Sequence, residues 1–326
     1  MTNLARHHHY IPQAYLKGFA HKRSESQWFT HVTDFSADRA YTANVRNVCG
    51  ERDFLRIDVD GYAPDAIEKE MSNFEAQCIG AIRRIAETGK FDGEDSNLAL
   101  NLMALMAVRS PEMRENLRGF HEQVAKRVMD VTLATKDRWE GQVARMRADG
   151  VPVNDMTYED VKSFHKSDQY KVTLAREYHI GTEFKMMDTV LESLGQRLWT
   201  VYTTDGSTGE FLTTNRPVTL TYIEPEKVPP IYRRSPGFGL TNTEVYFPLT
   251  RNAILIGRFD RGGQTVAANE PFIAAVNTHM LRNSHGKAFS RQPEFLYLNP
   301  RDLTINRDGL LLEKTRAWKE SVSERK

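Results

Sequence analysis

The chain has 326 residues and a formal net charge of +1, and 40% of its residues are apolar and 27% charged. This balance is typical of a globular protein with a full core. The near-zero net charge excludes a protein that binds nucleic acid through a generally basic surface. No apolar leader is present and no window approaches about 18 consecutive apolar residues, so we expect neither secretion nor a membrane span. The two cysteines form no CxxC pair, which suits a reducing compartment, and we therefore expect a cytoplasmic protein.

Short strands are expected first, and a long helix after them. Aromatic and β-branched residues recur at short intervals between residues 28 and 58, which predicts short strands. From Ile67 to Ile85, apolar residues recur every three or four positions, as they do on one face of a helix. Pro64 fits the first turn and Gly89 a C-terminal stop, so this pattern predicts one helix between them.

Helical patterns continue as far as Gly195. A second helix is expected to begin near Asp95 or Ser96, which are both good N-cap residues. Pro111 interrupts this helix, and apolar residues at helical spacing resume beyond the break. Thr157 with Asp160 three residues later is typical of a capping box that opens a further helix.

The rest of the chain is rich in short β-prone runs separated by turn residues. Strands are expected at residues 199–203, 211–214, 218–223, 245–247, 253–259, 289 and 295–298, and a helix at residues 271–282. This order predicts an α+β fold in which a helical middle segment packs on a mainly antiparallel C-terminal β-sheet. We expect a single domain with four parts: a motif segment (1–62), a helical segment (63–196), a β-rich segment (197–312) and a frayed polar tail (313–326).

The densest group of chemically active side chains lies near the N-terminus. Three consecutive histidines at positions 7–9 are followed by Tyr10, and Gln13 comes after Pro12. Histidine can act as an acid, a base or a metal ligand near neutral pH. Adjacent residues of a strand face opposite sides, and no zinc-ligand spacing accompanies these histidines. We therefore expect no metal and no other cofactor at this segment.

The same segment contains its own anchors. Pro12 restricts the residue before it to an extended conformation. Tyr15, Leu16 and Phe19 can then pack into a core from a short helix after the proline. His8, His9 and Gln13 remain as a fixed polar edge, and a glutamine can bind a base edge or orient a water molecule.

A turn between two predicted strands is the second candidate for chemistry. Residues 213–218 read Thr-Thr-Asn-Arg-Pro-Val, so Asn215 and Arg216 stand at the end of a strand. Functional groups often project from such positions, although a turn stabilised by asparagine and proline has the same composition. Asn277 lies on a largely apolar helix and needs partners if it is buried, and those partners are either backbone groups or a ligand.

A loop at residues 229–239 is the third candidate. It combines prolines with aromatic residues and with Arg233 and Arg234, and Tyr232 lies beside them. Aromatic rings stack on bases and arginines bind phosphate, so this composition suits a loop that contacts nucleic acid. An ordinary exposed loop has a similar composition.

In chain order these blocks resemble an uncharacterised bacterial family, the domain of unknown function 4238. The family's opening signature is similar to His-His-Tyr-(Ile/Val)-Pro-Gln-x-Tyr-Leu-x-x-Phe, which His8 to Phe19 match throughout. Further similar blocks are Val48-Cys49 to Phe54, the helix around Glu75, Arg109-Ser110-Pro111, Pro248-Leu249-Thr250 and Asn277. The resemblance implies a bacterial or phage-associated setting, often connected with defence, and it implies no particular reaction.

One block departs from the family pattern. The family's strand-end block resembles Thr-Ser-Asp-Asn-Pro-Val, whereas Asn215 stands here at the position of the aspartate. An amide cannot act as a carboxylate base or as a strong metal ligand. Either an acid elsewhere replaces this carboxylate, or Asn215 and Arg216 orient a substrate.

No phosphate-binding loop, dinucleotide fingerprint or nucleophile elbow is present, which disfavours phosphoryl and hydride transfer. The function expected first is a nucleic-acid-directed hydrolase, a DNA glycosylase type of base excision in defence against phage, with DNA as the partner. The residues expected to be catalytic are His8, His9, Gln13 and Asn215, and those expected to bind substrate are Tyr10, Arg216, Tyr232, Arg233, Arg234 and Asn277.

Two alternatives remain open at this point. A metal-dependent nuclease or toxin would use His8 or His9 with a remote aspartate. A non-enzymatic binding or regulatory protein would use the histidines as a structural plug. A carboxylate facing the histidines in a cleft favours an enzyme, whereas an apolar cage around them favours the plug.

Overall fold

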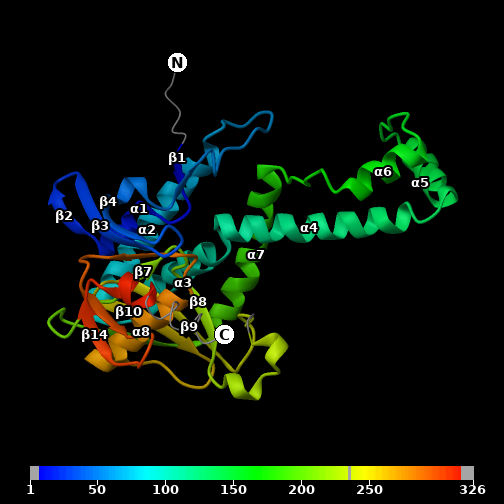
Figure 1. Ribbon diagram of the computed structural model, residues 1–326. Helices are drawn as coiled ribbons and strands as arrows, with labels where there is room; N and C mark the ends of the chain where they lie inside the picture. Colours follow the sequence, from blue (N-terminus) through cyan, green and yellow to red (C-terminus); the bar gives the residue numbers. More distant parts are fainter. Residues whose placement is uncertain (1–6, 234–235, 317–326) are drawn as a thin grey trace. The chain divides into compact units, whose positions relative to one another are not determined.

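The computed structural model of the protein describes residues 7–233 and 236–316, so Arg234 and residues 317–326 of the polar tail lie outside the described residues. The chain forms two compact units (Figure 1). The main unit contains residues up to 110 and residues from 180 onward, and the helical unit contains residues 111–179.

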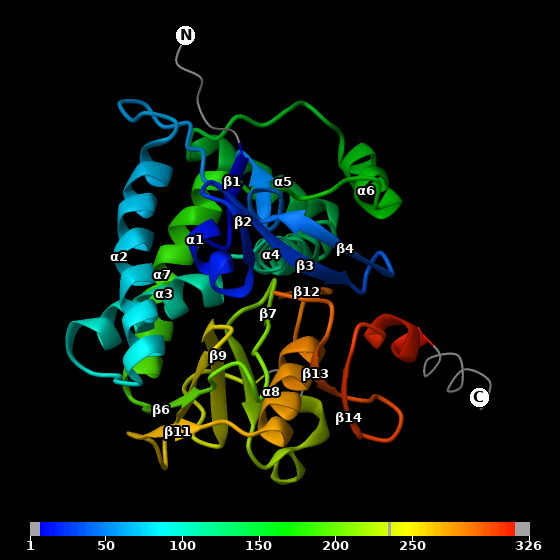
Figure 2. The same cartoon turned by 90° about the vertical axis from the view of Figure 1, so that its left-hand side faces the viewer.

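The helices and strands alternate in long blocks along the chain (Figure 2). The helices are α1 (Gln13–Leu16), α2 (Ala66–Thr88), α3 (Gly93–Val108), α4 (Pro111–Thr132), α5 (Lys136–Ala148), α6 (Tyr158–Ser167), α7 (Arg176–Gly195) and α8 (Glu270–Arg282). The strands are β1 (His7–His9), β2 (His21–Ser24), β3 (Gln27–Asp34), β4 (Arg39–Asn44), β5 (Gly50–Arg52), β6 (Leu198–Thr203), β7 (Thr213–Thr214), β8 (Thr219–Tyr222), β9 (Thr243–Thr250), β10 (Ala253–Arg258), β11 (Thr265–Ala267), β12 (Lys287–Ser290), β13 (Phe295–Leu298) and β14 (Ile305–Asp308).

Three local signals coincide with helix ends, whereas the helix expected to begin near Asp95 begins two residues earlier, at Gly93. Gly89 follows α2 in the left-handed conformation, with φ of 72°, which a residue with a side chain rarely adopts. Pro111 is the first residue of α4, so the expected break separates α3 from α4. The side chain of Thr157 accepts a hydrogen bond from the backbone N–H of Asp160 and caps α6.

A five-stranded sheet forms the centre of the main unit, in the order β11-β6-β10-β9-β8. Its pairs are antiparallel except for β11 with β6. Leu255 of β10 faces the larger core cluster, whereas its neighbours Ile254 and Ile256 face the smaller one. Side chains of a strand alternate between faces, so this sheet separates two apolar layers.

Helices cover both faces of this sheet. Helix α2 packs against β6 and β9 on the side of the larger core, and α3 runs beside α2. The apolar side of α8 contributes Ile273, Val276 and Met280 to the smaller core. The fold is therefore mixed α+β, with a helical middle segment and antiparallel C-terminal sheets, as expected.

A second sheet joins the two ends of the main unit. Its order is β2-β3-β12-β7, and β4 pairs with β3. Strand β12 pairs with β3 in a register that places Phe289 opposite Val32, although these residues are far apart in sequence. The N-terminal strands thus share a sheet with the C-terminal segment.

The strand expected at residues 211–214 is shorter than its composition suggests, because β7 contains only Thr213 and Thr214. The backbone N–H of Phe211 donates to Arg251 O, and that of Leu212 donates to the side-chain oxygen of Asn277. Because these partners do not belong to a neighbouring strand of the sheet, Phe211 and Leu212 are not part of β7. Both side chains are nevertheless buried.

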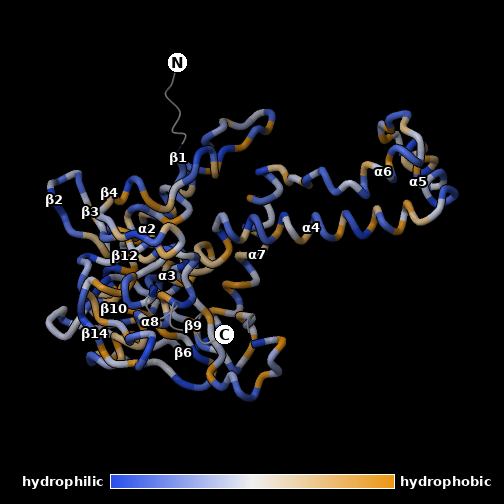
Figure 3. Tube along the Cα trace, in the orientation of Figure 1, coloured by the Kyte–Doolittle hydropathy of each residue, from blue (hydrophilic) through white to orange (hydrophobic). Residues whose placement is uncertain are grey.

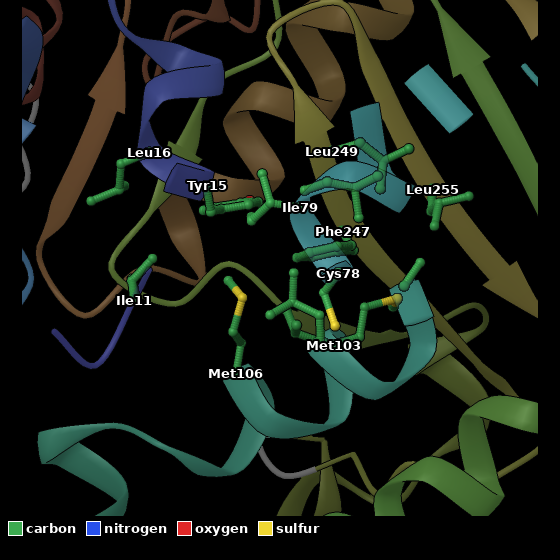
Figure 4. Packing of buried hydrophobic residues seen from close by; sticks show 14 of the residues in the cluster. Ile11, Tyr15, Leu16, Cys78, Ile79, Met103, Met106, Phe247, Leu249 and Leu255 are labelled. Carbon is green, nitrogen blue, oxygen red and sulfur yellow. The ribbon is translucent and has the colours of Figure 1, made fainter. Parts of the chain in front are cut away.

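The anchors expected in the N-terminal motif lie in the larger core. Tyr15, Leu16 and Phe19 are almost completely buried. The ring of Tyr15 stacks on Phe247 of the central sheet at 5.6 Å between ring centroids (Figure 4). Its hydroxyl donates to Pro248 O at 2.7 Å, and burial raises the pKa of this phenol. The motif is therefore held by the middle of the sheet.

The helical unit combines polar contacts with aromatic stacking. None of the described side chains of α4, α5 or α6 is fully buried. Within this unit, His165 contacts Asp130 at 2.9 Å and the hydroxyl of Tyr170 at 2.7 Å. Apolar residues nevertheless recur along α4 (Figure 3), and Phe120 is 61% exposed.

Candidate active site

His9 and Gln13 of the polar edge line a pocket of about 270 Å³. One wall comes from the N-terminal segments and contributes His9, Gln13, Ala14 and Leu55. The other wall is one face of α2, formed by Glu68, Met71, Ser72, Glu75 and Ala76. These positions are three or four residues apart, which is the spacing that brings helical side chains to one face.

His8 lies directly behind this pocket and is only 2% exposed. Its Nδ1 accepts a hydrogen bond from the backbone N–H of Leu55 at 2.8 Å. Its Nε2 lies 3.1 Å from Oε2 of Glu68. Because Nδ1 accepts, Nε2 carries the proton and donates it toward the carboxylate. His8 therefore holds one oxygen of Glu68 at the pocket wall.

His9 faces the pocket, and both of its ring nitrogens are engaged. Nε2 donates to Arg46 O at 3.1 Å, so Nδ1 accepts from the amide nitrogen of Gln13 at 3.3 Å. Burial lowers the pKa of His9 to about 4, and the nearby His7, His8 and Arg109 act in the same direction. His9 is thus neutral at pH 7 and orients Gln13.

A second carboxylate of the pocket is bound by a buried arginine. Arg109 is 2% exposed, and its Nη2 donates to Oε1 of Glu75 at 2.6 Å. Its Nε donates to Tyr10 O at 3.3 Å. Arg109 thereby ties the helix face of the pocket to the N-terminal motif, and it neutralises the charge of Glu75 from behind.

Local sequence explains how these groups are presented. In β1, His7 is exposed while its neighbour His8 is buried, because successive side chains of a strand face opposite sides. Tyr10 packs on Phe54 at 6.0 Å between ring centroids, which keeps the next segment beside the motif. The strand pair of β1 with β5 then brings Leu55 to His8.

The residues expected to be catalytic do not all lie together. His9 and Gln13 line the pocket and His8 contacts its wall at Glu68 from behind, whereas Asn215 does not line it. The side-chain oxygen of Asn215 accepts from the backbone N–H groups of His285 and Lys287, and its nitrogen donates to His285 O. Asn215 braces the chain that enters β12.

Asn277 is completely buried, and all of its hydrogen bonds go to backbone groups. Its oxygen accepts from the N–H of Leu212 at 3.0 Å, and its nitrogen donates to Glu210 O at 3.0 Å and to Leu296 O at 2.9 Å. Asn277 therefore joins α8 to β13 and to the segment before β7. These three hydrogen bonds satisfy the side-chain amide of Asn277 without a ligand.

The remaining expected substrate-binding residues lie outside the pocket lining. Tyr232 is 63% exposed, and the guanidinium of Arg233 donates to Val228 O and Glu226 O of its own loop. Arg216 is exposed. Tyr10 is buried and contributes its backbone oxygen to Arg109.

Sequence reasoning missed Glu68 as a site residue. Glu68 and Glu75 are seven residues apart on one helix, which is about two turns. Glu70 and Glu87 lie on the same helix and are exposed, so the sequence alone could not distinguish them from the pocket residues Glu68 and Glu75. The only indication in the sequence was that Glu75 and Arg109 fall within the blocks that resemble the family.

The chemistry of this pocket is that of oriented carboxylates. Among residues 7–233 and 236–316, no group of three or more histidine, cysteine, aspartate or glutamate side chains is arranged to hold a metal ion. His8 and His9 already use both ring nitrogens within the protein.

Within the described residues, none of the helices has the length and apolar character needed to cross a membrane.

The comparisons with known proteins agree with the resemblance noted in the sequence. No curated protein and no solved structure matches this chain. A family model described as "Protein of unknown function (DUF4238)" matches residues 7–294, which include the whole pocket and most of both units. The chain therefore belongs to the DUF4238 family.

Proposed function

We propose that this protein is a DNA-directed hydrolase that excises bases by cleaving the N-glycosidic bond, in defence against phage. The observation that carries the proposal is the contact between His8 and Glu68 at the wall of a pocket. A carboxylate that faces the polar edge formed by His8, His9 and Gln13 is what an enzyme requires, and an apolar plug would not need it.

The proposed chemistry assigns a role to each group at this wall. When the bond between the base and C1′ breaks, positive charge develops on the sugar. Glu68 is placed to stabilise that charge and to accept the proton of the attacking water through Oε1, while His8 holds Oε2. Gln13, oriented by His9, is placed to hold the water. The water oxygen bonds to C1′, and the electron pair of the broken C1′–N bond stays on the base. The base takes up a proton from solvent, and Glu68 returns the proton of the water to solvent.

One further feature, an exposed loop, supports DNA as the substrate. A base inside a duplex cannot reach a pocket, so enzymes that act on bases extrude them. Proteins that distort DNA often insert apolar side chains between bases. Ile231 is 82% exposed and Tyr232 63% exposed in a loop that begins with two prolines, which is a suitable wedge.

The test is base release from modified phage DNA and from synthetic duplexes, measured by chromatography of free bases and by alkali-induced cleavage. We expect release that persists in EDTA, and a reduction of roughly 100- to 10,000-fold in Glu68→Gln. Glutamine can still accept from His8, so this variant should fold. Glu70→Gln, on an exposed position of the same helix, is the matched control and should retain full activity.

The alternatives predict different results. Strand cleavage that EDTA abolishes, without free base, would identify a metal-dependent nuclease instead. Intact DNA in both conditions, from well-folded protein, would leave a binding or regulatory protein and overturn the proposal.

A further inference from the structure

The hydrogen-bonding groups still available at the pocket are mainly acceptors. Arg109 engages Oε1 of Glu75, and no described residue hydrogen-bonds to Oε2. His8 engages Oε2 of Glu68, and Gln13 uses its nitrogen on His9. One oxygen of each of these three side chains is therefore left: those of Glu68 and Gln13 serve the attacking water in the proposed function, and that of Glu75 is left for the base.

The charges at the pocket exclude a negatively charged ligand. Its lining contains two carboxylates and, among the described residues, no lysine or arginine. His9 is neutral at pH 7 because burial lowers its pKa to about 4. Arg109 lies behind Glu75 and is 2% exposed, so it compensates one carboxylate without offering a site for phosphate. A neutral group that carries hydrogen-bond donors fits this arrangement best.

Glu75 is the acceptor with the best-defined orientation. Its Oε1 lies 2.6 Å from Nη2 of Arg109, whose Nε is in turn held by Tyr10 O. The carboxylate side chain is 19% exposed, so it lies at the pocket rather than in open solvent. With one oxygen held, Oε2 is the atom that a ligand can reach.

We infer that Glu75 selects the base: its Oε2 accepts a hydrogen bond from an exocyclic amino group, so the pocket takes amino-bearing bases and rejects their keto counterparts. Carboxylates pair with the exocyclic amine of cytosine in the same way when proteins read base edges. A keto base would present an oxygen to this carboxylate, and two acceptors repel each other. The inference rests on the proposed function and names its class of substrate.

Glu75→Gln tests this assignment because it changes one atom. Glutamine can keep its oxygen on Arg109, and it then presents an NH₂ group where the glutamate presented Oε2. The preference should therefore invert. Wild-type protein should favour an amino base over its keto analogue by roughly 10- to 100-fold in kcat/KM, and Glu75→Gln should favour the keto base. Glu70→Gln should keep the wild-type preference.

Two readouts separate this inference from the proposed function. The first compares base release from the best oligonucleotide substrate and from its analogue with oxygen in place of the amine. The second is titration of the full-length protein with cytidine and uridine, followed by calorimetry, which needs no turnover. Base release without a preference would overturn the role of Glu75 and leave the hydrolase intact.

If no oligonucleotide releases a base, the proposed function fails and the titration decides. Tighter binding of cytidine than of uridine, reversed in Glu75→Gln, would support the assignment of Glu75. Equal binding of the two nucleosides, or binding of neither, would overturn it.

Discussion

Three substitutions of His8 can separate its part in folding from its part in positioning Glu68. His8→Ala removes the acceptor of the Leu55 N–H and the donor to Glu68 together. His8→Asn keeps a polar atom near the position of Nδ1 and loses only the donor to Glu68. His8→Gln keeps a donor near the position of Nε2 and loses the acceptor for Leu55.

The size of the stability effect follows from burial. Leu55 is 4% exposed, so its backbone N–H would lose its partner in a dry environment, which costs about 1–3 kcal/mol. The contact with the partly exposed Glu68 adds about 1 kcal/mol. His8→Ala should therefore lower the free energy of unfolding by about 2–4 kcal/mol. For a chain of this size, this loss corresponds to a decrease in Tm of roughly 5–15 °C.

The assay combines thermal unfolding with base release by the folded protein. His8→Asn should lose less stability than His8→Ala, but its kcat/KM should decrease roughly 100-fold because Glu68 is no longer held in place. His8→Gln should show the opposite pattern, with a larger loss of stability and a smaller loss of activity. A His8→Ala protein that melts within about 1 °C of wild type would refute the reasoning, as would equal effects of His8→Asn and His8→Gln on both readouts.

Asn277→Leu should lower the free energy of unfolding by at least about 3 kcal/mol, because three backbone groups lose their partners. Urea unfolding measures this loss, and an unchanged kcat of the folded fraction would agree with a structural role. Burial lowers the pKa of His279 to about 4, so an unfolded chain binds a proton at this residue more readily below pH 6.5. The stability supplied by neutral His279 is complete above pH 6.5 and is lost as the pH falls toward 4. In His279→Gln this pH dependence should be weaker, and an identical slope would contradict the assignment. Arg109→Met should destabilise the protein by about 3–5 kcal/mol because Glu75 loses its partner, and the double variant with Glu75→Gln should recover part of that loss. A double variant no more stable than Arg109→Met would argue against the pairing.

Elements governed by neighbouring residues could be predicted from the sequence. The apolar period from Ile67 to Ile85, the stop at Gly89 and the break at Pro111 all act within a few residues, so the helices α2 and α3 and the start of α4 followed from them. The alternation of buried and exposed histidines in β1 is likewise a local property of an extended chain. Tyr15 was expected in the core because it can anchor the short helix after Pro12 together with Leu16 and Phe19, and it is almost completely buried.

The contacts that define the pocket depend on residues far apart in the chain, and only the folded structure shows them. In the sequence, Glu68 and Arg109 cannot be distinguished from exposed charged residues. Their roles follow from their partners, because the fold places Glu68 against His8 and Arg109 against Glu75. For Asn277 the opposite holds. Its polar side chain on an apolar helix suggested a substrate-binding residue, whereas in the fold it hydrogen-bonds to backbone groups. Periodicity determines which face of a helix is apolar, whereas the partners of a polar side chain depend on which distant segments the core brings together.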